Sequence, residues 1–256
     1  MPLHAVARAG FSQVPREYER GRPSYPPPAV RHLRERLAIG AASRVVELGA
    51  GTGKFTRALR GEGLDPIAVE PIAAMRAELH AAHPDVPLLA GVAEALPFRT
   101  GSLDAVVAAQ AFHWFRPDPT VAALARVLAP GGGVGLVWNL RDESVPWQRE
   151  LSRRLEEFRP AGVPSSRERA WQESFRRHPG FEPLSSATFP FEQVGDVALL
   201  IDRIHSVSFV AALPAGRRAV LLAEIRALGE RAVHDAEDGR LHLRYRTEVH
   251  STRRRG

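Results

Sequence analysis

The pattern of apolar and polar residues divides the chain near residue 139. Five short apolar runs before that point, bounded by Gly, Pro or Asp, predict β-strands at 44–48, 66–70, 87–91, 104–110 and 133–139. Because these runs do not alternate strictly, they are typical of strands buried on both faces of a parallel sheet. The stretches between them predict helices at 54–60, 73–83 and 119–128. Strand–helix–strand alternation of this kind predicts a doubly wound α/β sheet with right-handed crossovers.

After residue 139 the spacing of apolar residues becomes helical. Three apolar faces recur at intervals of three and four residues: Trp147, Leu151, Leu155 and Phe158; Val197, Leu200, Ile201 and Ile204; Val220, Leu221, Ile225 and Leu228. Two strand-like segments, 184–193 and 241–250, lie among them, and the second alternates well enough to predict an antiparallel edge strand. We therefore expect helical additions around two late strands that complete the sheet.

The composition of the chain mainly excludes certain kinds of site and partner. The chain of 256 residues has no cysteine, which excludes disulfides and thiolate metal sites, and no other metal-ligand spacing is evident. The net charge of +6 could indicate a nucleic-acid surface, but Lys54 is the single lysine and the arginines are interleaved with acids. Such arginine usage is typical of a GC-rich genome, so we do not expect nucleic-acid binding. No apolar run approaches the ~18 residues of a membrane span and the first 21 residues are polar, as expected of a cytoplasmic protein.

The segment after the first predicted strand carries three glycines at alternate positions, Gly49, Gly51 and Gly53. The dinucleotide fingerprint G-x-G-x-x-G fails because Lys54 stands where its third glycine should be. The P-loop fails because Phe55 follows Lys54 and Leu48 occupies the position of the first glycine. What matches is an acidic residue that closes the strand, Glu47, followed by G-x-G-x-G. A tight strand-to-helix turn with no ligand is the alternative for this segment taken alone.

With this loop the sequence resembles the class I S-adenosylmethionine-dependent methyltransferases, in particular the broad group that acts on small molecules. The segments "GVAEALPF" (91–98), "LDAVVAAQAFHWF" (103–115) and "RVLAPGGGVGLVWN" (126–139) extend the resemblance. It implies a Rossmann-like, mostly parallel seven-stranded sheet with an antiparallel last strand and helices on both faces. It also implies S-adenosylmethionine as cofactor and S-adenosylhomocysteine as product. The cofactor has a cationic sulfonium and ammonium and no phosphate, which suits an acid beside the loop.

The resemblance also implies which residues hold the cofactor. Backbone of the loop would contact its methionine and ribose, Glu70 at the end of the second strand would accept hydrogen bonds from the ribose, and apolar side chains would cover the adenine. An acid that often accepts from the adenine amino group is replaced by Val92, for which Glu94 is a candidate substitute. The expected cofactor-binding residues are Glu47, Gly49, Ala50, Gly51, Thr52, Glu70, Pro71, Ile72, Met75, Ala93, Glu94 and Gln110.

His113 and Trp114 are the expected catalytic residues, because they follow the fourth strand at the edge where open α/β sheets bind ligands. His113 could act as a general base or simply as a donor that orients the loop. Trp114 could form a wall between methyl donor and acceptor, or hold the cationic methyl group over its ring.

The segment "YERGRPSYP" (18–26) resembles a lid that precedes the first helix in one branch of the family, so Tyr18 and Arg22 are further candidates for cofactor binding. The expected organisation is then a lid and first helix in 1–40, a cofactor-binding core in 41–141, and helical substrate-cap elements with the last two strands in 142–256.

The expected function is methyl transfer to a small-molecule acceptor by a monomer or homodimer. Three alternatives stay open: methylation of RNA or protein, a non-catalytic module that binds S-adenosylmethionine or a nucleotide, and a nucleotide-binding oxidoreductase. An arginine-lined pocket for an acidic acceptor is a further hypothesis.

Overall fold

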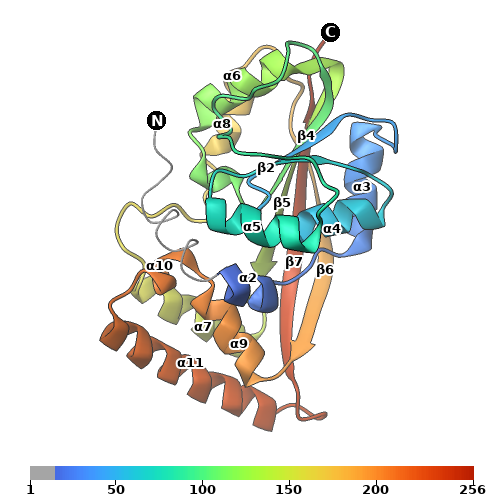
Figure 1. Cartoon of the computed structure of the whole chain (residues 1–256). Helices are drawn as coiled ribbons and strands as arrows, with labels where there is room; N and C mark the ends of the chain where they lie inside the picture. Colours follow the sequence, from blue (N-terminus) through green and yellow to red (C-terminus); the bar gives the residue numbers. More distant parts are fainter. Residues whose placement is uncertain (1–14) are drawn as a thin grey trace. The chain divides into compact units, whose positions relative to one another are not determined.

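The computed structural model describes residues 15–256 (Figure 1). Its backbone divides into two compact units. The helical unit comprises the described part of 1–23 together with 140–163 and 190–246, and the core unit comprises 24–139, 164–189 and 247–256. Every residue of the predicted cofactor site except Tyr18 and Arg22 belongs to the core unit.

Seven strands form one sheet in the order β3-β2-β1-β4-β5-β7-β6. The first four strands along the chain are parallel to one another and to β5, with β1 paired to β2 and β4. The strands are β1 (Val45–Leu48), β2 (Ile67–Val69), β3 (Leu88–Leu89), β4 (Leu103–Ala109), β5 (Leu128–Arg141), β6 (Ser185–Gly195) and β7 (Leu241–Arg253). All seven predicted strands are therefore present, and the chain order reverses direction between β1 and β4, as in a doubly wound fold.

The last strand is antiparallel, as expected, but it is not an edge strand. Gly131 N donates to Arg254 O at 3.0 Å and Arg254 N donates to Gly132 O at 2.8 Å, the two-against-one pattern of a β-bulge in an antiparallel pair. β7 lies between β5 and β6, and β6 forms the edge. The prediction of an edge position was wrong because alternating exposure only requires one solvated face, which an interior antiparallel strand can also have.

Five helices and a short 3₁₀ helix belong to the core unit, and several of them are amphipathic as predicted. Their bounds are α3 (Pro27–Leu37), α4 (Lys54–Gly61), α5 (Ala73–Ala82), η1 (Phe112–Trp114), α6 (Pro117–Val127) and α8 (Trp171–Arg177). Proline at the first turn favours the starts of α3 and α6, because that position has no intrahelical partner for an N–H. The sequence pattern did not predict α8, which is only seven residues long.

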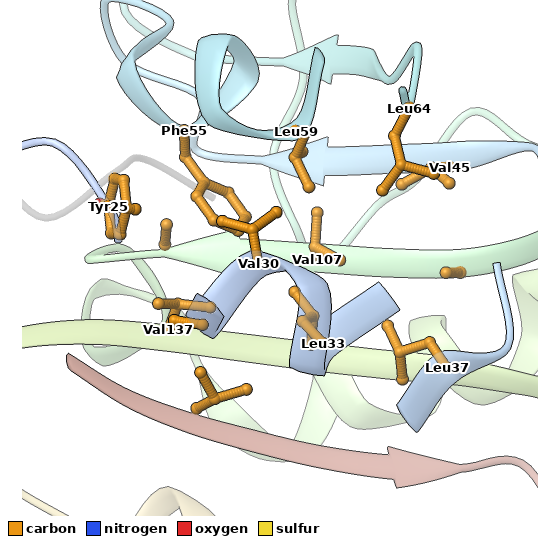
Figure 2. Close-up of a cluster of buried hydrophobic side chains, with 14 of the residues drawn as sticks. Tyr25, Val30, Leu33, Leu37, Val45, Phe55, Leu59, Leu64, Val107 and Val137 are labelled. Carbon is orange, nitrogen blue, oxygen red and sulfur yellow. The ribbon is translucent and has the colours of Figure 1, made fainter. Parts of the chain in front are cut away.

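One face of the sheet is covered by apolar side chains of α3 and α4 (Figure 2). Leu33 of α3 and Leu59 of α4 are fully buried against strand residues such as Val107. Gly135 of β5 permits the close approach of α3, because a Cβ there would lie 2.4 Å from Leu33 Cδ1. This packing fixes α4, and with it the end of the glycine loop.

The helical unit contains α2 (Pro15–Gly21), α7 (Pro146–Glu157), α9 (Val197–His205), α10 (Ser208–Ala211) and α11 (Ala215–His234). Within this unit α9 contacts α2, α10 and α11. Leu221, Ile225 and Leu228 are buried as the helical pattern predicts, but Val220 is 56% exposed. That part of the prediction was wrong because Val220 is adjacent in sequence to Leu221 and so lies about 100° around the helix from it. Among the described residues, no helix combines the length and apolar character needed to span a membrane.

Candidate functional site

The glycine loop connects β1 to α4 through three residues with positive φ. Gly49, Gly51 and Gly53 have φ of 64°, 60° and 90°, values that glycine adopts without the cost that a side chain brings. Gly49 N donates to Val69 O at 2.8 Å, which ties the start of the loop to the end of β2. The three alternate glycines in the sequence are therefore the three residues of the loop whose backbone adopts the left-handed region.

Gly49 also lacks room for a side chain. A Cβ at this position would lie 2.7 Å from Ala111 Cβ and 3.5 Å from Phe115 Cζ, both in the segment that follows β4. The missing side chain thus allows the loop after β4 to pack on the glycine loop. Ala50 and Thr52, between the glycines, are buried.

We expect Gly49→Ala to lower the free energy of unfolding by about 2–4 kcal/mol, through left-handed strain and overpacking against Ala111. Gly63→Ala is the matched control: Gly63 has φ of 75°, and a Cβ there would meet nothing within 4 Å, so only the strain of about 1–2 kcal/mol should appear. Urea unfolding of both variants measures the difference. Equal losses would show that the contact with Ala111 relaxes freely.

Glu70 links the glycine loop to the start of α5. Its side chain is 4% exposed, and its Oε2 accepts from Gly51 N at 3.0 Å while Oε1 accepts from Ile72 N at 2.8 Å. Burial raises the pKa of Glu70, although the two N–H donors and the charge of Arg76 oppose the shift. The carboxyl group predicted to bind ribose therefore lies at the carboxyl end of β2, next to the central glycine.

Glu47 is enclosed in the core unit beneath this loop. It is 1% exposed, and its Oε2 accepts from Thr56 Oγ1 of α4 at 2.6 Å. Burial raises its pKa to about 8, the hydrogen bond from Thr56 lowers it, and the charge of Glu70 raises it further. Glu47 is therefore mostly protonated at pH 7 in the free protein, so it adds little negative charge beside the loop.

The residues predicted to surround adenine follow β2 and β3. Ile72, Met75 and Ala93 are buried, whereas Pro71 and Glu94 are half-buried. Glu94 Oε1 accepts from Arg116 N at 2.9 Å, just before α6. One oxygen of the candidate substitute for the missing acid at Val92 is therefore engaged within the protein.

Gln110 directly follows β4 and has an unusual backbone conformation. It is one of two non-glycine residues with positive φ in the described part of the chain, at 53°, and its Nε2 donates to Asn139 O at 2.9 Å. Strain of this kind is concentrated at functional sites. Asn139, 5% exposed at the end of β5, also donates through Nδ2 to Ser24 O and accepts from Thr247 Oγ1. The sequence analysis missed this residue, although a polar side chain closing an apolar run was a usable signal.

His113 and Trp114 of η1 are half-buried, whereas Phe112 of the same helix is buried. Trp138 Nε1 donates to His113 Nδ1 at 3.3 Å. An indole nitrogen can only donate, so Nδ1 must be unprotonated and the ring proton of neutral His113 resides on Nε2. In this tautomer His113 presents a donor at Nε2, not a base. Trp138 is a second residue that the sequence analysis did not select.

An aromatic cluster supports η1 from within the core unit. Trp138 stacks on Trp171 of α8 with ring centroids 5.2 Å apart. Phe112 packs edge-on against the Trp171 ring, with centroids 5.5 Å apart. Arg169 lies over the Trp138 ring and pairs with Glu248, whose pKa His250 and Arg169 lower to about 2. The indole that fixes His113 is therefore itself held by stacking and by a charged group.

Tyr18 and Arg22 belong to the helical unit, whereas the other predicted site residues belong to the core unit. The Arg22 guanidinium lies 4.8 Å from the Tyr18 ring centroid and donates through Nε to Ser206 Oγ at 3.1 Å and through Nη2 to Ser206 O at 3.0 Å. These contacts hold both residues at the junction of α2 and α9. Their role toward a cofactor stays a prediction.

Comparison with known proteins decides the family. Residues 46–135 match the family described as methyltransferase domain. The chain is also 35% identical over 237 residues to an uncharacterized methyltransferase-like protein of Schizosaccharomyces pombe, across 92% of each chain. The chain belongs to the class I methyltransferases.

Two further comparisons agree with this assignment. A stretch of 141 residues is 51% identical to an uncharacterized methyltransferase of Mycobacterium tuberculosis and spans 55% of this chain and 56% of that one, so just over half of each is aligned. The solved structure of a protein described as a type II methyltransferase from Anaeromyxobacter dehalogenans superposes with a TM-score of 0.59 at 26% identity, covering 91% of this chain and 96% of that one.

In this methyltransferase the carboxyl ends of three adjacent parallel strands bring the main candidates to one edge of the sheet. The loop at 49–53 follows β1, Glu70 follows β2, and Gln110 to Trp114 follow β4, with β1 in the middle. The hydrogen bond from Gly51 to Glu70 and the contact of Gly49 with Ala111 join the three segments. Open α/β sheets bind their ligands at this edge.

Proposed function

We propose that this protein transfers the methyl group of S-adenosylmethionine to a small-molecule acceptor. The observation that carries the proposal is the Glu70 carboxyl group, which lies at the end of β2 and accepts a hydrogen bond from the central glycine of the loop. In the family resemblance, an acid at this position holds the ribose. Membership of the methyltransferases supports the same cofactor.

The residues present fit such a cofactor. The positive-φ glycine loop offers bare backbone, and buried Ile72 and Met75 offer an apolar surface for adenine. Each Glu70 oxygen accepts one backbone N–H, and a carboxylate oxygen has a second lone pair available for a ribose hydroxyl. Glu94 accepts from Arg116 N through Oε1 alone, so we infer that its Oε2 can accept from the adenine amino group, while packing and backbone groups hold the ring.

S-adenosylmethionine would supply a methyl group already activated by its sulfonium. The chain therefore has to bind the two partners, align them and exclude water, effects that contribute up to ~7–11 kcal/mol to lowering a barrier. Half-buried Trp114 and the strained turn at Gln110 are the residues we assign to this alignment.

In this proposal His113 orients the acceptor and does not remove its proton. Because Trp138 donates to Nδ1, neutral His113 carries its ring proton on Nε2, and we assign this N–H the role of donor to a lone pair of the acceptor. This role differs from the two considered from the sequence, a general base and a donor that orients the loop, and the hydrogen bond from Trp138 supports a donor over a base.

We expect Trp138→Phe to release His113 from this tautomer while keeping an aromatic ring in the stack. Long-range ¹⁵N–¹H correlation spectra at pH 8 should show protonated Nε2 for His113 in the wild type and a mixture of tautomers in the variant. His113→Gln identifies the signal. A wild-type His113 protonated at Nδ1 would contradict the assignment.

Once an acceptor is known, His113→Gln, which keeps a donor near the Nε2 position, should retain more activity than His113→Asn, which keeps a group near Nδ1. A gap of roughly 2–10-fold is expected for one hydrogen bond. The reverse order of activities would favour a role at Nδ1.

The observations favour a small acceptor over nucleic acid. The three arginines near the C-terminus, the main basic cluster of the sequence, are engaged with backbone carbonyls: Arg253 with Arg36 O, Arg254 with Leu128 O and Arg255 with Phe181 O. Each of these side chains is thus held against the backbone of another segment of the protein.

Incubation of the protein with methyl-labelled S-adenosylmethionine and a cell extract, divided by ultrafiltration, tests the proposal. Label is expected in the low-mass fraction, unaffected by nuclease or protease treatment. Label confined to RNA or protein would replace the small-molecule proposal with a macromolecular one. Binding of S-adenosylhomocysteine without any transfer to either fraction would favour a non-catalytic module.

A further inference from the structure

In the described part of the helical unit, one arginine has buried guanidinium donors without a hydrogen-bond acceptor. Arg203, near the end of α9, is 6% exposed. Among the residues that the structure describes, none accepts a hydrogen bond from its buried Nε or Nη1 atoms. The sequence pattern gave no reason to select it, since it is one of many arginines in the chain.

This arrangement is costly in the free protein. A guanidinium group keeps its charge in proteins, and burying an unpaired charge opposes folding strongly. Buried donors without acceptors are rare in native proteins, and each one points to a structural or functional reason, such as a bound ion. An anion that reaches Arg203 would compensate this cost.

The surroundings of Arg203 along the chain offer no acid for this purpose. The preceding residue, Asp202, is already paired with Arg20, with Oδ2 2.8 Å from Nε. Ser206 Oγ donates to the Arg203 carbonyl oxygen and accepts from Arg22 Nε. The junction of α2 and α9 therefore collects two guanidinium groups, Arg22 and Arg203, and the carboxylate next to Arg203 in the chain is paired with a third, that of Arg20.

The backbone at this junction is tightly packed. A Cβ on Gly21, at the end of α2, would lie 2.3 Å from Arg203 N. The contact of α2 with α9 brings Arg22, which directly follows α2, to the helix that carries Arg203. The Arg203 backbone is thus fixed by packing of α9 against the end of α2.

We propose that Arg203 forms an anion-binding site in the helical unit, assisted by Arg22, for a carboxylate-bearing small molecule. The chemistry is charge-assisted hydrogen bonding from the unpartnered guanidinium donors to carboxylate oxygens. The inference stands on the helical unit alone and does not depend on methyl transfer.

Thermal unfolding of the full chain, in succinate, in inorganic phosphate and in sodium chloride of equal ionic strength, tests the site. Succinate at millimolar concentration should raise the unfolding midpoint of the wild type by a few degrees, saturably, because it binds only the folded state. Phosphate should have a smaller effect. A larger effect of phosphate would overturn the choice of a carboxylate, and equal midpoints in all three salts would overturn the site.

Arg203→Met separates anion binding from a purely structural role. Replacing an unpaired buried charge with an apolar side chain of similar length should raise the midpoint in chloride by a few degrees and abolish the response to succinate. Arg226→Met, at an exposed position of α11, should change neither. A lower midpoint or failure of Arg203→Met to fold would overturn the proposal, because it would reveal a stabilising partner. Arg203→Lys should fold, and succinate should raise its unfolding midpoint less than that of the wild type. A rise as large as in the wild type would also contradict the proposal.

Discussion

Glu47→Gln is expected to make the protein more stable at pH 8–9 and to leave its stability almost unchanged below pH 4.5. The carboxyl group has a pKa of about 8 in the folded protein, raised mainly by burial, against 4.5 in an exposed chain. Between these two pH values the folded state holds a proton that the unfolded state has lost. Wild-type stability therefore falls as pH rises from about 4.5 to 8.

Glutamine has no proton to lose and still offers an oxygen to Thr56, so this loss should disappear in the variant. The stability gain over wild type should grow with pH to the order of 3–5 kcal/mol above pH 8. Denaturant unfolding at unit steps of pH measures it, with exposed Glu35→Gln of α3 as the control. A difference between variant and wild type that does not change with pH would mean that Glu47 stays ionised in the folded protein.

Glu70→Ala is expected to weaken binding of S-adenosylhomocysteine by about 1–3 kcal/mol, or roughly 5- to 150-fold in Kd. The substitution removes the proposed acceptor for the ribose hydroxyls. It also releases the N–H groups of Gly51 and Ile72, which orient the loop. Isothermal titration calorimetry of the folded variant gives the affinity.

Asp104→Ala is the matched control for Glu70. Asp104 lies at the amino end of β4, where its carboxylate accepts from Arg44 N at 2.7 Å, on the opposite edge of the sheet from the proposed site. Its removal should leave the affinity for S-adenosylhomocysteine unchanged. If Glu70→Ala binds as tightly as the wild type, Glu70 has no part in the site.

Much of the fold could be predicted because buried parallel strands leave a strong signal. "RVVEL" and "DAVVAAQ" read as strands because both faces of β1 and β4 are covered, and the helical spacing of Leu151 and Leu155 reports one buried face of α7. The interior position of β7 could not be read, since strand order depends on pairing partners far away in the sequence. The short helix α8 owes its position to the stacking of Trp171 on Trp138, which no local pattern encodes.

Some residues of the candidate site could likewise be predicted from the sequence, whereas their tertiary contacts could not. Spacing selected the glycine loop and the family resemblance selected Glu70, and both could be placed because they directly follow predicted strands. The burial of Glu47 and the hydrogen bond from Trp138 to His113 could not be predicted, since each depends on tertiary contacts that change the chemistry of a residue already selected. Likewise, the unpartnered donors of Arg203 are a property of its surroundings and not of its sequence.

The central claim is that the edge formed by the glycine loop and Glu70 binds S-adenosylmethionine and not a phosphate-bearing nucleotide. Calorimetric titration of the wild-type chain with S-adenosylhomocysteine, and separately with NADH, tests it most directly. We expect one-to-one binding of S-adenosylhomocysteine with a micromolar Kd and no measurable heat from NADH. Micromolar binding of NADH in the absence of any binding of S-adenosylhomocysteine would contradict it.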